Sequence, residues 1–238
     1  MHAEDEIGEF SYDERSGRGP SRWGDLRANW FLCKNGTMQS PIALRDLKAQ
    51  LTLEGLQTNY QPSAATLVNV ELEWVGGGGT LLINGTQFVL QQCHWHSPSE
   101  HTISGKRFPL EIHMVHSAAG KIAVIGMLYW FGKSPDPFLE MFTNSIRNIS
   151  RRPGAKRDVG IVDPNQININ GGEYYRYMGS LTTPPCNESV IWTVIRKGPT
   201  VTLEQVQLLR DAVYDKSNAR PLQPLNSRTV QLYVPREN

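Results

Sequence analysis

Apolar and polar residues alternate along the middle of the chain with the period of two that is typical of β-strands. The run Thr80–Gln91 alternates around Asn84-Gly85, a dipeptide that favours a tight hairpin turn. Leu110–His116 and Lys121–Phe131 are two further strand candidates, and the short polar link between them predicts an antiparallel pair. The pattern therefore predicts a β-rich fold.

Two segments show the spacing of three and four between apolar residues that predicts short surface helices, namely Pro137–Asn148 and Thr202–Val213. The glycine run Gly76–Gly79 has no Lys-Ser/Thr after it, so we interpret it as the end of a hairpin rather than as a phosphate-binding loop. No internal repeat or linker divides the chain. We expect a mobile acidic tail over residues 1–10 and one domain over residues 11–238.

Composition removes several classes of function. The 238 residues carry 24 Lys+Arg and 23 Asp+Glu, a formal charge of +1, which argues against a nucleic-acid partner. With 39% hydrophobic residues and 6 Trp, the chain can bury a sizeable core. No stretch reaches the roughly 18 apolar residues that a membrane-spanning helix needs, so we expect no membrane span.

Cysteines and glycosylation sequons bear on the compartment. The 3 Cys allow one disulfide at most, and cysteine arithmetic alone does not choose the pair. Asn-x-Ser/Thr sequons favour a secreted glycoprotein, with candidate sites at Asn35, Asn84, Asn148 and Asn187. The charged start of the chain is unlike a signal peptide, so we expect secretion to use a leader that is absent from this sequence.

Five of the 6 histidines fall within 23 residues: His94, His96, His101, His113 and His116. Because side chains alternate along a strand, His94 and His96 point to one face while Cys93 and Trp95 point to the other. On the next candidate strand, His113 points to the face opposite to that of His116. If these strands pair, His94, His96 and His113 converge and leave a fourth position open.

Three imidazoles with an open position describe a catalytic zinc site, because structural zinc is usually closed by four ligands rich in cysteine. A ligating histidine normally donates its second ring N–H to an acceptor, and Gln92 and Glu111 have the spacing to accept from His94 and His113. We expect His101 and His116 to be buried histidines bonded to their neighbours.

Glu100 lies four residues after His96 and leaves its role open as ligand, base or hydrogen-bond acceptor. The pattern His94-x-His96-x-x-x-Glu100 also fits the first motif of a cupin-type metal oxygenase, in which Glu100 is a fourth ligand to a redox metal. The glycine spacing of that motif is missing, however, and no second cupin motif follows.

Seven segments spread over nearly the whole chain resemble the alpha-class carbonic anhydrases. They are Gly19–Trp23 (GPSRW), Gln39–Ile42 (QSPI), Gln92–His96 (QCHWH), Ser99–His101 (SEH), Leu110–His116 (LEIHMVH), Gly179–Pro185 (GSLTTPP) and Arg220–Asn226 (RPLQPLN). Tyr174–Gly179 (YYRYMG) is most similar to the plant branch, which includes dioscorins and nectarin.

The resemblance implies a predominantly β fold: a single domain with a central, largely antiparallel twisted sheet and short surface helices. It implies a zinc lyase for the reversible hydration of carbon dioxide to bicarbonate, with Zn²⁺ on His94, His96 and His113. Thr182 would accept a hydrogen bond from the zinc-bound hydroxide and donate its own to Glu100. Sulfonamides and anions would then be inhibitors.

The same resemblance assigns supporting residues. Those that would contact the substrate are Thr183, Val115, Val124, Leu181 and Trp192. Gln92, Glu111 and His101 would stand behind the zinc ligands. A cysteine after the Thr-Thr-Pro-Pro sequence pairs in many relatives with one near the start, which implies a Cys33–Cys186 disulfide and a free Cys93.

One departure concerns the proton. Fast members of the family place a shuttle histidine in the strand pair before the zinc strand, whereas this chain has Leu67–Trp74 (LVNVELEW), without histidine. We therefore predict no internal shuttle and slow or buffer-dependent proton export. A storage, defence or binding protein on the same fold is the alternative function, and a homodimer is a further expectation.

Overall fold

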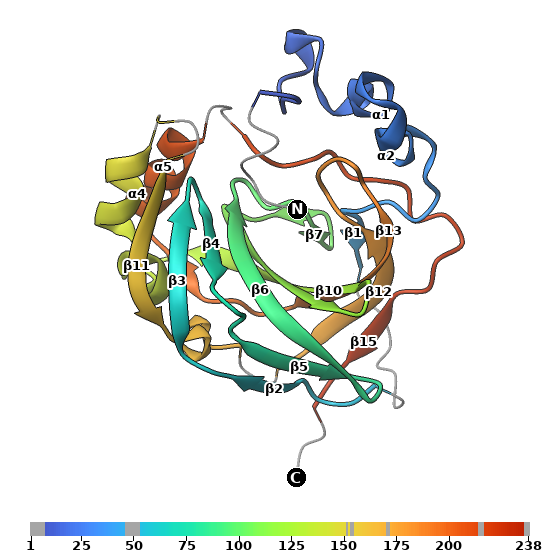
Figure 1. Cartoon of the computed structure of the whole chain (residues 1–238). Coiled ribbons are helices and arrows are strands. Elements are labelled where there is room, and N and C mark those ends of the chain that lie inside the picture. The colour runs from blue at the N-terminus through green and yellow to red at the C-terminus, as the bar shows by residue number, and fades with distance from the viewer. Residues whose placement is uncertain are drawn as a thin grey trace.

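The computed structural model describes residues 8–45, 53–150, 152, 155–169, 172–213 and 217–235. Within these ranges, a 12-stranded sheet forms the centre of the molecule (Figure 1). Its strands are β2 (Gln57–Tyr60), β3 (Ser63–Val68), β4 (Glu71–Trp74), β5 (Gly79–Ile83), β6 (Thr86–His96), β9 (Leu110–Ala118), β10 (Lys121–Phe131), β11 (Lys156–Val162), β12 (Tyr174–Ser180), β13 (Glu188–Ile195), β14 (Thr200–Val201) and β15 (Gln231–Tyr233).

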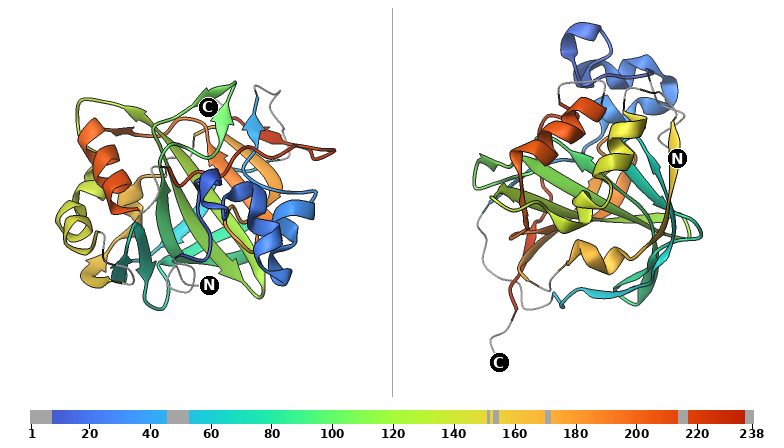
Figure 2. Two further views of the ribbon diagram at one scale, coloured as in Figure 1. Left: turned by 90° about the horizontal axis from the view of Figure 1, so that it is seen from above. Right: turned by 90° about the vertical axis from the view of Figure 1, so that its left-hand side faces the viewer.

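The strand order is β11-β3-β4-β6-β9-β10-β13-β12-β15, with β5 and β2 continuing beside β6 and β14 beside β10. Most neighbours are antiparallel, and the parallel pairs of this sheet are those of β10 with β13 and β14. Figures 1 and 2 show the sheet strongly twisted. The predicted β-rich fold with a largely antiparallel twisted sheet is confirmed.

The predicted hairpin lies between β5 and β6, where Ile83 pairs with Thr86 across a two-residue turn. Asn84 and Gly85 both have positive φ, 48° and 73°, as a type I′ turn requires. The interpretation of Gly76–Gly79 as a hairpin end is wrong. β4 and β5 run in one line along the same neighbour, β6, and Gly76–Gly78 lie in the irregular connection between them, while Gly79 begins β5.

Helices lie outside the sheet, as the sequence predicts. Thr202–Val213 contains α5 (Leu203–Ala212), whose first turn is closed by a capping box of Thr202 and Gln205. Pro137–Asn148 is instead two helices, α3 (Pro137–Glu140) and α4 (Thr143–Ile149). The break at Phe142 lets its ring, like that of Phe138, pack near Trp95. Figure 2 shows α4 and α5 side by side.

Shorter elements complete the described chain. They are the sheet of β1 (Ala43–Leu44), β7 (Thr102–Ile103) and β8 (Lys106–Arg107), the helices α1 (Trp23–Leu26) and α2 (Leu32–Asn35), and the 3-10 turns η2 (Glu14–Ser16), η3 (Pro20–Arg22), η4 (Ala28–Trp30) and η5 (Pro164–Ile167). Residues 1–7 of the expected tail lie outside the described residues, whereas Phe10 packs edge-on against Trp23. No helix among the described residues is long and apolar enough to cross a membrane.

The sheet separates two apolar clusters, and this separation positions the histidines. Cys93 and Trp95 of β6 lie in the larger cluster, together with Ile112 and Met114 of β9. Residues that point to the opposite face of the sheet, such as Val124 of β10 and Trp192 of β13, lie in a second cluster. The histidines of β6 and His113 of β9 therefore face the second cluster.

Candidate metal centre and family

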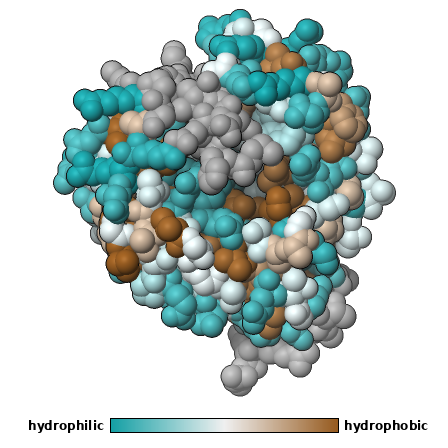
Figure 3. All heavy atoms as spheres, viewed as in Figure 1, coloured by the Kyte–Doolittle hydropathy of each residue, from teal (hydrophilic) through white to brown (hydrophobic). Residues whose placement is uncertain are grey.

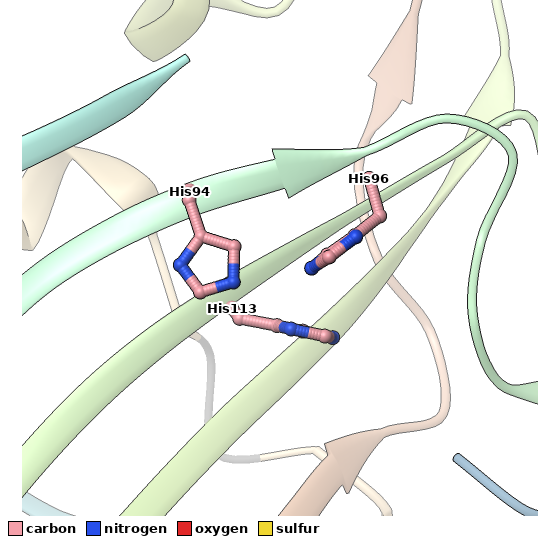
Figure 4. A group of neighbouring side chains, drawn as sticks. All are labelled: His94, His96 and His113. Carbon is pink, nitrogen blue, oxygen red and sulfur yellow. The ribbon is translucent and has the colours of Figure 1, made fainter. Parts of the chain in front are cut away.

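Three histidines converge at the centre of the sheet. His94 and His96 come from β6, and His113 comes from β9 as the direct register partner of His94. One nitrogen from each ring lies within 4.8 Å of the others. Figure 4 shows the three rings pointing toward a common centre. His96 and His113 are buried, with 2% and 1% of their surfaces exposed.

The second nitrogen of each ring has an acceptor. His94 Nδ1 donates to Gln92 Oε1 at 2.8 Å, and His113 Nε2 donates to Glu111 Oε1 at 2.8 Å. His96 Nδ1 donates to the main-chain oxygen of Asn218 at 2.6 Å. Because these oxygens only accept, the protons lie on these nitrogens and the lone pairs of the other three face the centre.

The unprotonated nitrogens fit a metal ion. His96 Nε2 is buried and has no hydrogen-bond partner in the described part of the chain, a costly arrangement unless another atom binds there. Burial lowers the pKa of His96 and of His113, and it holds the pKa of His94 well below its usual value. Neutral imidazole is the form that binds a divalent cation such as Zn²⁺.

Glu111 anchors this arrangement from behind. Its Oε2 accepts the backbone N–H groups of Glu100 and His101, both at 2.8 Å. Its Oε1 accepts from His101 Nδ1 at 2.7 Å and from His113. Burial opposes ionisation of Glu111, but the nearby rings of His101 and His113 hold its pKa well below the usual range. His101 thus acts on the centre through Glu111, and its Nε2 accepts from the Tyr177 hydroxyl at 2.7 Å.

Glu100 lies beside the three histidines, with its Oε2 4.0 Å from His113 Nδ1, but outside the group of converging ligand atoms. Its Oε1 accepts the backbone N–H of Arg220 at 2.8 Å, and the group of ligand atoms that converge at the centre comprises the three histidines without Glu100. Burial raises the pKa of Glu100 to about 6, against the opposing effects of His113, the Arg220 N–H and the Thr182 hydroxyl. Thr182 and Glu100 are therefore neighbours, as the resemblance implies.

A cleft of about 570 Å³ opens onto the trio. The predicted substrate contacts all line it, namely Val115, Val124, Leu181, Thr183 and Trp192, together with Thr182. Sequence reasoning missed other lining residues, among them Phe10, Tyr12, Arg18, Asn69, Glu71, Ile122 and Val213. Figure 3 shows apolar residues in a hollow near the middle of this face, with polar residues around it. The lining of the cleft therefore combines apolar and polar side chains.

The loop that carries Thr182 is tied to the start of the chain. Cys33 and Cys186 form a disulfide across 153 positions of sequence, and Cys93 is a buried free thiol, so the expected pairing is confirmed. The candidate glycosylation sites are all exposed: Asn35, Asn84, Asn148 and Asn187. His116 lies on the other face of the sheet, where its Nε2 and the Tyr60 hydroxyl are 2.8 Å apart.

Comparison with known proteins decides the family. The family model for eukaryotic-type carbonic anhydrase matches residues 18–234. The chain belongs to this carbonic anhydrase family.

The chain is 48% identical to alpha carbonic anhydrase 7 of Arabidopsis thaliana, a match that covers 95% of this chain and 86% of that protein. It is 45% identical to dioscorin dioA3 of Dioscorea japonica, over 93% of this chain and 85% of that protein. The crystal structure of a dioscorin complexed with ascorbate has a TM-score of 0.91 and 42% identity, and it covers 96% of this chain and 99% of its own.

A sulfanilamide complex of the alpha-carbonic anhydrase from Thermovibrio ammonificans has a TM-score of 0.83 and 35% identity. The match covers 93% of this chain and 98% of that one. Family and fold together exclude the cupin alternative.

Proposed function

We propose that the chain is a zinc-dependent carbonic anhydrase that hydrates carbon dioxide reversibly to bicarbonate and a proton. The observation that carries this proposal is the set of three lone pairs, on His94 Nε2, His96 Nε2 and His113 Nδ1, fixed by three separate acceptors. When bound there, Zn²⁺ supplies a Lewis acid that makes water nucleophilic near neutral pH, as is established for carbonic anhydrases.

The walls of the cleft bind the substrate beside the three histidines in this proposal. Val115, Val124 and Trp192 give an apolar surface beside the centre, which suits an uncharged linear molecule and excludes water. Thr182 and Glu100 interact, and in this proposal the Thr182 hydroxyl donates to the Glu100 carboxylate and turns an acceptor lone pair toward the centre. That lone pair selects one orientation of an O–H group there, which positions its oxygen for attack.

Proton export is the slow step in this proposal. Among the described residues, no imidazole besides the trio lines the cleft, because His101 and His116 are buried behind it or on the other face of the sheet. Dissolved buffer therefore accepts the proton, and turnover depends on buffer concentration.

Stopped-flow hydration of carbon dioxide by the zinc-loaded protein tests this function at low and high imidazole buffer. We expect activity that rises steeply with buffer. Buffer-independent activity would contradict the export step alone. No activity with bound zinc would instead favour a storage or binding role, for which the dioscorin similarity is the supporting observation.

The remaining assignments complete the proposal. The disulfide and the plant relatives support a secretory route, with glycans on the exposed sequons. Sulfonamide binding follows from the similarity to the sulfanilamide complex, because the same cleft faces the trio here. A homodimer stays a prediction, which light scattering of the purified chain checks.

A further inference from the structure

A second cavity, of about 490 Å³, lies among the ends of several strands away from the cleft. It is lined by Ile103, Ser104, Lys106, Phe108, Trp130, Glu173, Arg196 and Lys197, none of which lines the cleft. Trp130 stands four residues along β10 from Gly126, the register partner of His113, a distance of about 13 Å in a strand. A molecule bound in this cavity therefore does not contact the three histidines.

Two aromatic rings form an apolar surface in the cavity. Phe108 is 3% exposed, and the perpendicular ring of Trp130, with centroids 4.8 Å apart, is 39% exposed. The phenyl ring thus supports an indole that presents much of its surface to solvent. A rigid aromatic surface of this kind gives contact area to a ligand at a low cost in conformational entropy.

Positive charge surrounds the rings. Lys106 Nζ lies 3.8 Å from the centroid of the Trp130 ring and 5.7 Å from that of Phe108, a cation–π arrangement that holds the ammonium in place. Lys197 is exposed at the rim, and Arg196 pairs with Glu173 at 2.8 Å. Three positive side chains and one negative one give the lining a net charge of +2. The cavity therefore favours an anion, and the ordering of Lys106 lowers the entropy lost on binding.

We propose that this cavity binds a uronate ring of an acidic oligosaccharide. The carboxylate of the sugar meets Lys106 and Lys197, and the C–H face of the ring lies on the exposed part of Trp130. Glu173 accepts a hydrogen bond from a ring hydroxyl. That last group favours a hydroxylated ligand, because the Glu173 carboxylate, although it pairs with Arg196, keeps acceptor lone pairs to which ring hydroxyls can donate.

Calorimetric titration of the intact chain with trigalacturonate tests the site, with and without added zinc. We expect saturable binding that is independent of zinc and weakens as salt is added. Trp130→Ala and Lys106→Gln should each weaken binding by about tenfold. Phe131→Ala is the matched aromatic control, because Phe131 is 57% exposed on the same strand but does not line the cavity. Lys133→Gln is the corresponding charge control.

Four results would overturn the proposal. The first is no binding up to about 10 mM trigalacturonate, and the second is equal binding of neutral maltotriose. The third is wild-type affinity for trigalacturonate in both cavity variants. The fourth is binding to anionic lipid vesicles that Trp130→Ala abolishes and that trigalacturonate does not compete with. The exposed Lys106 side chain makes Lys106→Gln safe for folding, so this variant decides the matter if Trp130→Ala is unstable.

Discussion

Replacing Glu111 by glutamine turns one buried acceptor oxygen into an NH₂ group and leaves the size of the side chain unchanged. The backbone N–H groups of Glu100 and His101 can only donate, so the amide oxygen must take the position of Oε2. The new NH₂ group then faces His101 Nδ1 and His113 Nε2, where Oε1 accepted at 2.7 and 2.8 Å. Both rings must now accept at these nitrogens.

The consequence for His113 is a change of tautomer. Its proton moves from Nε2 to Nδ1, the nitrogen that faces His94 and His96, and a protonated nitrogen has no lone pair for a metal. Binding requires the ring to return to a tautomer whose N–H points at the new NH₂ group. We expect zinc affinity to fall about 10- to 100-fold, or about 1.4 to 2.7 kcal/mol.

Competition with a chromophoric chelator near neutral pH measures this affinity without any use of turnover. Gln92→Glu is the control, because a carboxylate at that position still accepts from His94 Nδ1 and keeps its tautomer. Circular dichroism and urea unfolding establish that Glu111→Gln is folded. A folded Glu111→Gln protein that binds zinc within about twofold of wild type would refute the tautomer reasoning.

Three further predictions concern other residues. Burial lowers the pKa of His116 from 6.5 to about 4, so the fold favours its neutral form. Urea unfolding should show that the free energy of unfolding falls by about 3 kcal/mol as the pH falls from 6.5 to 4. An equal fall in the His116→Gln variant would contradict this cause. Opening the disulfide with Cys33→Ser and Cys186→Ser frees a loop of 153 positions and should cost about 4 to 5 kcal/mol of unfolding free energy, whereas an unchanged urea midpoint would disprove it. Thr182→Val should lower kcat/KM in stopped flow by about 100-fold and leave zinc affinity intact. Full activity of this variant would show that Thr182 has no role in catalysis.

The alternation of side chains along the strands was enough to predict which histidines can converge. Alternation placed His94 and His96 on one face of their strand and His113 opposite His116 on the next, and the register of β6 and β9 brings the three together. The reason is that a strand fixes side-chain direction with a period of two, so facing follows from position. Parity also selected Gln92 and Glu111, the acceptors two residues from their histidines.

Long-range partners could not be predicted in this way. The acceptor for His96 is the backbone oxygen of Asn218, 122 positions away, and a carbonyl carries no side-chain signal. Gly76–Gly79 misled for a related reason: local glycine content predicts a turn but not which strand lies beside it, and β4 and β5 share one neighbour. Similarity to a family, rather than periodicity, suggested the Cys33–Cys186 pair.

The distribution of the three acceptors sets the order in which the centre is completed. His94, His96 and His113, with Gln92 and Glu111, lie on β6 and β9, which pair across a connection of 13 residues that carries β7 and β8. Asn218 comes more than a hundred residues later and alone fixes the tautomer of His96. A nascent or truncated chain that ends before residue 218 thus holds two oriented imidazoles and one undirected one. The orientation of His96 therefore depends on docking of the carboxyl-terminal segment, so metal affinity reports whether that segment is in place.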